Sequence, residues 1–188
     1  MNHADQLLVA KAMAFAATAH QKQFRSYGAP YFVHLYRVWQ SVQQSLMEGN
    51  VVSECVALLH DTIEDTDVTY EDIEREFGQE VAECVLQLTN DYSDHLPENE
   101  KLVATAKHIA KITNAKAQLV KLCDRLDNLY DCGSWKPARI ARYIRNTKVL
   151  LTTLPCDYTQ DVYKILKGCI EERLEELETR EELRALLT

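Results

Sequence analysis

Apolar residues recur along almost the whole chain at the three- and four-residue spacing of a helix, and no segment alternates apolar and polar residues as a half-buried strand does. Glycine and proline mark several of the breaks. The pattern predicts helices over residues 4–22, 31–47, 51–64, 69–76, 79–88, 99–112, 115–130, 137–151 and 159 to the end. We therefore expect an all-α fold, a bundle of roughly eight to ten helices in one domain.

Local signals add detail to this pattern. Thr69 precedes Asp72 by three residues, which is the spacing of a capping box, and Pro137 suits the first turn of a helix. The polar stretch NDYSDHLPENE, residues 90–100, predicts an exposed loop that can border a pocket. The leucine stripe of the last helix predicts packing against the rest of the molecule, or alternatively a dimer contact, so a homo-oligomer stays open.

Composition limits the possible functions. The 188 residues carry a net charge of −8, which argues against a broad nucleic-acid surface, although a few cations can gather in a nucleotide pocket. The N-terminus lacks the pattern of a signal peptide, and no apolar run is long enough to span a membrane. The six cysteines form no CxxC pair and predict reduced, mostly buried thiols. These features favour a cytoplasmic protein.

The sharpest chemical feature is the pair His60–Asp61, which lies inside the most apolar predicted helix. Burying an ionisable pair is costly unless strong partners, such as a metal ion, compensate for the lost hydration. Glu64 and Asp65 follow one turn later, so all four side chains border one side of the helix.

Two further residues can complete a coordination shell: His34, early in the second predicted helix, and Asp124, within an amphipathic helix. Taken alone, Asp124 is better explained by a salt bridge to Arg125, Arg142 or another base, and His34 by an ordinary buried histidine.

Three segments carry a resemblance to a known family: AHQKQFRSYGAPYFVH, ALLHDTIEDTDVT and LVKLCDRLDNL. Their order, H…HD…D, resembles the HD superfamily of metal-dependent phosphohydrolases. The segments are similar to HxxQxRxSGxPYxxHP, LLHDxxEDTxxT and LVKLADRLxNL of the RelA/SpoT-type (p)ppGpp hydrolases and their stand-alone small relatives. The resemblance spans residues 15–128 and implies an HD-domain helical bundle.

The resemblance implies roles for individual residues. The ligands of one divalent ion, usually Mn²⁺, would be His34, His60, Asp61 and Asp124. Imidazole and carboxylate ligands suit Mn²⁺ but would also accept Fe²⁺, Co²⁺, Ni²⁺ or Zn²⁺. The ED pair, Glu64 and Asp65, would orient or deprotonate the attacking water. Arg25 and Asn128 match residues near the substrate, and the weaker pocket candidates are Lys22, Lys121, Arg139 and Tyr143.

The function that the resemblance implies is removal of the 3′-diphosphate of a guanosine alarmone, ppGpp or pppGpp, as pyrophosphate. One alternative is an HD phosphohydrolase acting on an adenosine alarmone, NADPH or a deoxynucleotide, and another is a nucleotide binder without activity. The chain departs from the family pattern at Ser26 and Tyr27, where RKSG is frequent, and at Leu35, where proline is frequent. Recognition of the base and phosphates is therefore less closely specified than the metal ligands.

Overall fold

A computed structural model describes residues 2–45, 50–90, 96, 98–157, 159–180, 183, 186 and 187. The described helices are α1 (His3–Ala19), α2 (Phe32–Ser45), α3 (Val51–Leu59), α4 (Thr62–Asp65), α5 (Tyr70–Phe77), α6 (Gln79–Leu88), α7 (Glu98–Ile109), α8 (Ala115–Asp131), the 3₁₀ turn η1 (Cys132–Ser134), α9 (Pro137–Thr153) and α10 (Asp161–Glu178). In this part of the chain the only extended pairing is an isolated bridge between Phe24 and Pro30. The prediction of an all-α fold is confirmed.

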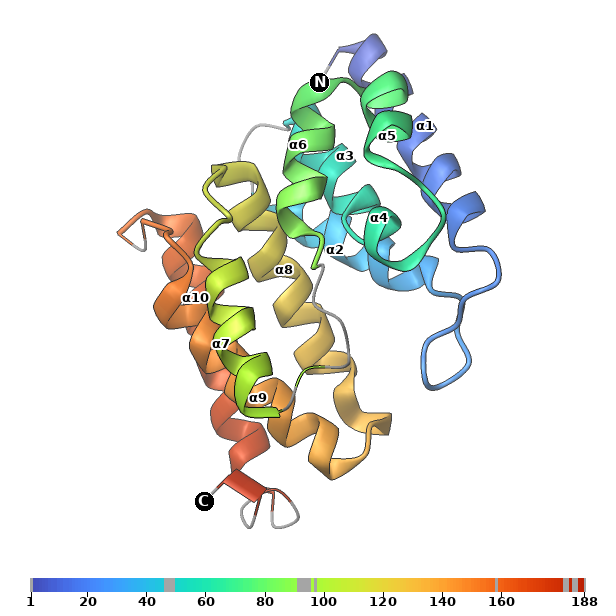
Figure 1. The fold of residues 1–188 in the computed structure, drawn as a ribbon. Helices are drawn as coiled ribbons and strands as arrows, with labels where there is room; N and C mark the ends of the chain where they lie inside the picture. Colours follow the sequence, from blue (N-terminus) through green and yellow to red (C-terminus); the bar gives the residue numbers. More distant parts are fainter. Residues whose placement is uncertain are drawn as a thin grey trace.

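The long helix α8 lies between two groups of helices (Figure 1). Helices α1 to α6 form the upper group in this view, whereas α7, α9 and α10 lie below and to the left. α8 contacts α2, α3 and α6 of the first group and α10 of the second. Its residues can therefore meet side chains from widely separated parts of the sequence.

Helix α3 is the centre of the upper group, because its residues from Ser53 to Leu59 are all buried. It packs against α1, α2, α6 and α8, and removing so much apolar surface from water stabilises this arrangement. The one charged residue on that stretch, Glu54, accepts hydrogen bonds from Trp39 Nε1 at 2.9 Å and Gln43 Nε2 at 3.0 Å. Its burial is thus partly compensated.

The prediction of one helix over residues 51–64 is wrong. α3 ends at Leu59, His60 and Asp61 form a turn, and α4 begins at Thr62. The Thr62 hydroxyl donates a hydrogen bond to the Leu59 carbonyl at 2.6 Å, and Asp61 adopts φ −101° and ψ 0°. A side chain that satisfies a terminal carbonyl favours the helix end. The break turns the Asp61 side chain toward the neighbouring helix α2, as the contacts below show.

Other boundaries differ by a few residues. α5 begins with the predicted capping box of Thr69 and Asp72. The last helix does not continue to the end of the chain, because α10 stops at Glu178 and the Thr179 hydroxyl caps the Glu176 carbonyl at 2.7 Å. Its leucines are buried as far as Leu177 and α10 packs on α8, as the packing interpretation expects.

Some sequence predictions fall on parts of the chain that lie outside the described residues. These are most of the predicted loop over residues 90–100 and the end of the second helix at residues 46–49. The end of the predicted loop is helical, since α7 begins at Glu98. The six cysteines are free, and four of them are buried. None of the described helices is long and apolar enough to cross a bilayer.

Candidate metal centre and catalytic site

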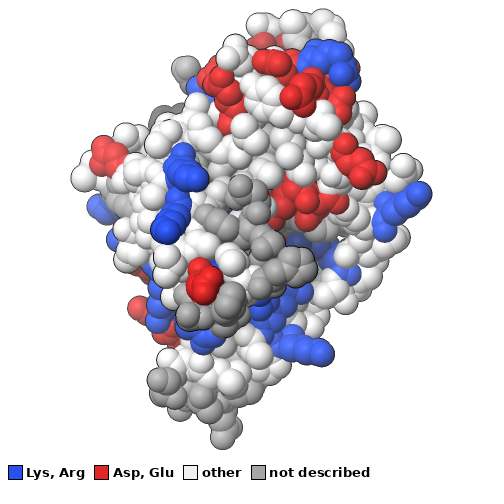
Figure 2. All heavy atoms as spheres, viewed as in Figure 1, with Lys and Arg blue, Asp and Glu red and all other residues white. Residues whose placement is uncertain are grey.

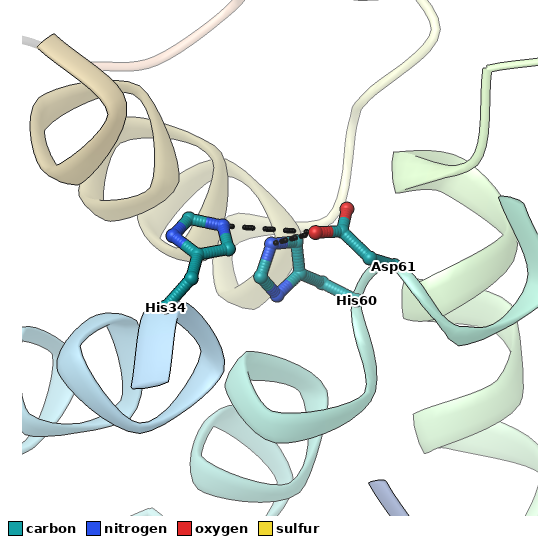
Figure 3. Close-up of side chains that lie close together, drawn as sticks. All are labelled: His34, His60 and Asp61. Atoms are coloured by element: carbon teal, nitrogen blue, oxygen red, sulfur yellow. Dashed lines mark ion pairs between the residues drawn. The ribbon is translucent and has the colours of Figure 1, made fainter. Parts of the chain in front are cut away.

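Three of the predicted metal ligands meet in one place (Figure 3). His34 extends from α2, and His60 and Asp61 from the turn between α3 and α4. One ligand atom from each lies within 4.8 Å of the others. Asp61 Oδ2 is 3.1 Å from His60 Nε2 and 3.6 Å from His34 Nε2.

The fourth predicted ligand, Asp124, approaches from α8. Its Oδ1 atom lies 3.3 Å from His34 Nε2 and 3.8 Å from His60 Nε2. The structure thus brings together residues from three helical segments that are far apart in the sequence. Among the described residues, the base within ion-pair distance of Asp124 is Lys121, at 3.6 Å, rather than Arg125 or Arg142. The salt bridge to a base is thus present beside the contacts to the two histidines.

Hydrogen bonds fix the tautomers of both imidazoles. His34 Nδ1 lies 2.6 Å from Asp127 Oδ2, and His60 Nδ1 lies 2.8 Å from the Ala57 carbonyl oxygen. Because these partners accept hydrogen bonds, each Nδ1 carries a hydrogen, and in the neutral imidazole the lone pair of Nε2 is left to bind a metal ion. Both Nε2 atoms are buried and have no hydrogen-bond partner among the residues that the structure describes.

The charges of the cluster act strongly on one another. Burial disfavours the imidazolium of His60, but Asp61 and Asp124 outweigh it and raise its pKa to about 9. The same balance raises the pKa of His34. Burial acts against the carboxylates too, yet the two histidines hold the pKa of Asp61 and of Asp124 well below its usual range. The two ionised carboxylates therefore favour a positively charged group between them.

This arrangement fits a divalent metal ion. Two unpartnered imidazole nitrogens and two ionised carboxylates converge, and each histidine is oriented through its other nitrogen, as metal-bound histidines usually are. Imidazole and carboxylate donors suit first-row metals.

Glu64 and Asp65 lie exposed at the rim of this cluster, on α4. Glu64 Oε2 accepts a hydrogen bond from the Asn90 main-chain N–H at 2.8 Å. Although the outer side of Glu64 is open to water, loss of hydration on its protein side raises its pKa to about 7, against the opposing effects of that hydrogen bond and of Lys121. Desolvation and repulsion from Asp61 also raise the pKa of Asp65. Carboxyl groups with raised pKa values suit proton transfer near neutral pH.

The two substrate-binding candidates with the clearest match are joined to each other. Arg25 donates from Nε and Nη2 to Asp131 Oδ2, at 2.8 and 2.6 Å, and from Nη2 to Asn128 Oδ1 at 2.8 Å. Asn128 Nδ2 in turn donates to Asp124 Oδ1 at 2.5 Å. The Arg25 side chain is 8% exposed and ion-paired with Asp131.

The weaker candidates differ in their surroundings. Tyr143 on α9 is packed between the Trp135 ring, at 5.2 Å, and the Arg125 guanidinium, at 4.2 Å. Arg139 is exposed and stacks over Trp135 at 3.9 Å, and Lys22 is exposed on the loop after α1. Arg139 and Tyr143 thus share one aromatic cluster.

Sequence reasoning missed Tyr31, Arg37, Asp127 and Asp131. Tyr31 donates to Asp61 Oδ2 at 2.7 Å, and Arg37 donates from Nε to Asp127 Oδ1 at 2.6 Å. Asp127 and Asp131 lie three and seven residues after Asp124, so helical spacing placed them on its side of α8. That spacing was the available signal.

The surface of the molecule also carries acidic and basic side chains close to one another. Figure 2 shows acidic side chains near the middle of this face and basic side chains below them. Such a neighbourhood can accept an anionic ligand near a cation-binding centre.

The fold and the site define a class of protein: an all-α chain with a largely buried His–His–Asp–Asp cluster that fits one metal ion. The family model described as "HD domain" matches residues 12–154, so the chain belongs to the HD domain family.

Known relatives narrow the comparison. The chain is 36% identical over 151 residues to guanosine-3′,5′-bis(diphosphate) 3′-pyrophosphohydrolase MESH1 of Xenopus tropicalis, covering 75% of this chain and 81% of the relative. It is 35% identical to the bifunctional (p)ppGpp synthase/hydrolase SpoT of Escherichia coli, but it spans only 21% of that protein. A solved structure described as a metazoan ortholog of SpoT that hydrolyses ppGpp matches with a TM-score of 0.76 at 27% identity, covering 90% of this chain and 94% of that one.

Proposed function

We propose that this chain is a metal-dependent hydrolase that removes the 3′-diphosphate of guanosine alarmones, converting ppGpp and water into GDP and pyrophosphate. The observation that carries the proposal is the convergence of His34, His60, Asp61 and Asp124 beside an acidic pair with raised pKa values. Relatives named for this reaction share the fold over most of their length.

The ligand set would hold one divalent ion, with Mn²⁺ as the proposed metal. When bound, such an ion lowers the pKa of water and neutralises charge on a phosphate. Asp127 and Ala57 keep the two imidazoles in the ligating tautomer, and Tyr31 orients Asp61. These neighbours determine where the ligand atoms point.

Glu64 and Asp65 are proposed to handle the water and its proton. The base takes a proton from the water that attacks the phosphorus attached to the 3′ oxygen. The bond between that phosphorus and the 3′ oxygen breaks, so pyrophosphate leaves intact, and the departing oxygen must gain a proton. A carboxyl group with a pKa near 7 can both accept and return a proton at neutral pH.

The substrate is proposed to bind along Arg25 and Asn128, with Arg139, Tyr143 and Lys22 as further contacts. The hydrogen bond of Asn128 to Asp124 connects this region directly to the metal ligands. Asp131 lowers the net charge around Arg25. Its hydrogen bond also orients the guanidinium, so a phosphate would bind a group that protein contacts already hold in place.

We further propose one domain, a small-molecule nucleotide as the partner rather than nucleic acid or a membrane, and a cytoplasmic location. The proposal is compatible with either a monomer or a homo-oligomer. The negative net charge supports a local rather than an extended anion site.

In the test, the Mn²⁺-loaded protein is incubated separately with ppGpp, pppGpp, ppApp, NADPH and a deoxynucleoside triphosphate. The products are then separated by ion-exchange chromatography. We expect GDP and intact pyrophosphate from ppGpp. If 3′-diphosphates remain uncleaved while another nucleotide releases phosphate, the chain is an HD phosphohydrolase of different specificity. If every nucleotide remains intact but ppGpp binds, the chain is a binder.

A further inference from the structure

Tyr31 contacts both a proposed metal ligand, Asp61, and a proposed substrate-binding residue, Arg25. It lies at the end of the loop that follows α1, just before α2 begins at Phe32. Its hydroxyl donates to Asp61 Oδ2 at 2.7 Å, and that same oxygen faces the Nε2 atoms of His34 and His60. The hydroxyl thus binds a carboxylate oxygen that lies within 4 Å of both imidazole Nε2 atoms.

The ring of Tyr31 is held on several sides. The buried imidazole of His20 stacks on it, with 4.9 Å between ring centroids and an angle of 17°. The His34 ring meets it edge-on at 5.6 Å, and the Arg25 guanidinium lies 5.6 Å from its centroid. A ring fixed in this way gives its hydroxyl one direction, which is what orientation of a ligand carboxylate requires.

His20 also connects the Tyr31 ring with the acidic pair. Its Nε2 atom is buried without a hydrogen-bond partner, and its Nδ1 lies 2.8 Å from Gln23 Oε1. Gln23 Nε2 donates to the Asp65 main-chain carbonyl at 2.5 Å. His20 therefore links the Tyr31 ring to the backbone of the acidic pair, and an imidazole buried at the cost of one unsatisfied nitrogen is explained by this stacking role.

We infer that Tyr31 is a positioning residue for both the metal ligands and the substrate-binding residues. Its hydroxyl orients the ligand carboxylate of Asp61. Its ring, which is held by His20, fixes the position of Arg25 relative to that carboxylate. The effects on kcat and KM that this inference predicts rest on the proposed function. The consequence for metal binding does not depend on which nucleotide is the substrate.

The first measurement is Mn²⁺ affinity of metal-stripped protein by titration calorimetry. Tyr31→Phe keeps the ring and removes only the hydroxyl, so we expect affinity to fall by roughly 10- to 100-fold, as is typical when a neighbour that orients a ligand is lost. The matched control is Tyr163→Phe, which also loses a hydrogen bond, from the hydroxyl to the Ala115 carbonyl at 2.9 Å. Equal Mn²⁺ affinity in wild type and Tyr31→Phe would overturn the inference.

The second measurement separates the hydroxyl from the ring at saturating Mn²⁺. Tyr31→Phe should lower kcat and leave KM for ppGpp unchanged, because the ring beside Arg25 remains. Tyr31→Leu should also raise KM, because Arg25 loses its aromatic neighbour. If both variants change only the melting temperature and leave kcat, KM and Mn²⁺ affinity intact, Tyr31 is an ordinary packing residue and the inference fails.

The two proposals can fail separately. If wild-type protein cleaves no alarmone, the proposed function fails, whereas the Mn²⁺ titrations still decide the role of Tyr31. The kcat and KM comparison then uses whichever nucleotide the wild type hydrolyses.

Discussion

Nδ1 of His34 lies 2.6 Å from Oδ2 of Asp127, and this contact joins α2 to α8 directly behind the proposed metal site. Asp127 also pairs with Arg37, whose Nε lies 2.6 Å from Oδ1. Burial would raise the pKa of Asp127, but the hydrogen bonds from His34 and Arg37 outweigh it and lower that pKa. The carboxylate therefore remains ionised and holds His34 in its ligating tautomer.

Asp127→Asn should weaken Mn²⁺ binding by roughly 10- to 100-fold, because an amide no longer fixes the imidazole hydrogen on Nδ1. Excess Mn²⁺ should restore most of kcat, since no ligand is lost. Calorimetric titration measures the affinity, and Asp161→Asn, an exposed change at the start of α10, is the control. Unchanged affinity in Asp127→Asn would contradict this role.

Asp61→Ala should abolish both metal binding and turnover, because the cluster loses one of its two carboxylates that face both imidazoles. In wild type, Mn²⁺ at 100 times its Kd stabilises the fold by about 2.7 kcal/mol, equivalent to a rise in Tm of roughly 5 to 11 °C. The variant should show no such rise in a thermal melt with and without Mn²⁺. Stoichiometric Mn²⁺ in purified Asp61→Ala would show that the ligand assignment is wrong.

Glu64→Gln and Asp65→Asn should each retain the metal while lowering kcat by roughly 10²- to 10⁴-fold, the usual effect of losing a general base. The pKa of Glu64 is about 7, and the base must be ionised, so wild-type activity should fall as pH decreases through 7. Rates are measured at saturating Mn²⁺ with occupancy checked at each pH. Loss of metal in parallel with activity would make these residues ligands instead.

Arg25→Lys should raise KM for ppGpp by more than it lowers kcat, by roughly 10-fold or more, because a lysine cannot reproduce the planar contacts to Asp131 and Asn128 and still meet a phosphate. Steady-state kinetics over a range of ppGpp concentrations tests this. Lys111→Arg, at an exposed position after α7, serves as a control for an exchange of cations. A pure decrease in kcat would place Arg25 in the chemical step.

Thr69→Ala should lower the free energy of unfolding by about 1 kcal/mol, because the hydroxyl and Asp72 form the capping box of α5. Thr69→Ser keeps the hydroxyl and should be nearly neutral. Urea unfolding monitored by circular dichroism compares the three proteins. Equal losses in both variants would assign the effect to the methyl group rather than to the cap.

Much of this organisation was predictable from the sequence, because helices leave a strong spacing signal. That signal placed Asp124 and Asn128 on one side of α8, and it predicted the start of α5 at Thr69. The proximity of His34 to His60 followed only from the resemblance, since no local pattern relates residues on different helices.

The contacts that orient the site were not predictable in the same way. Asp127 looks like an ordinary polar residue of an amphipathic helix, and its partner His34 is 93 positions away. Arg25 looks like a free cation, yet its partner Asp131 is 106 positions away. Both pairings depend on how α8 packs against the first helices. The turn at His60 and Asp61 was missed because the apolar pattern continues through it. The Thr62 hydroxyl, which donates to the Leu59 carbonyl, favours the helix end at this point.

The proposed ligands come from α2, the turn after α3, and α8, which are separated by long stretches of chain. An ion held by all of them would close these stretches into loops, much as disulfides do in secreted domains. Loading with metal should therefore slow global unfolding and hinder proteolysis at sites remote from the pocket. In a chain whose six cysteines are all free, the bound ion would also act as a cross-link that can be removed.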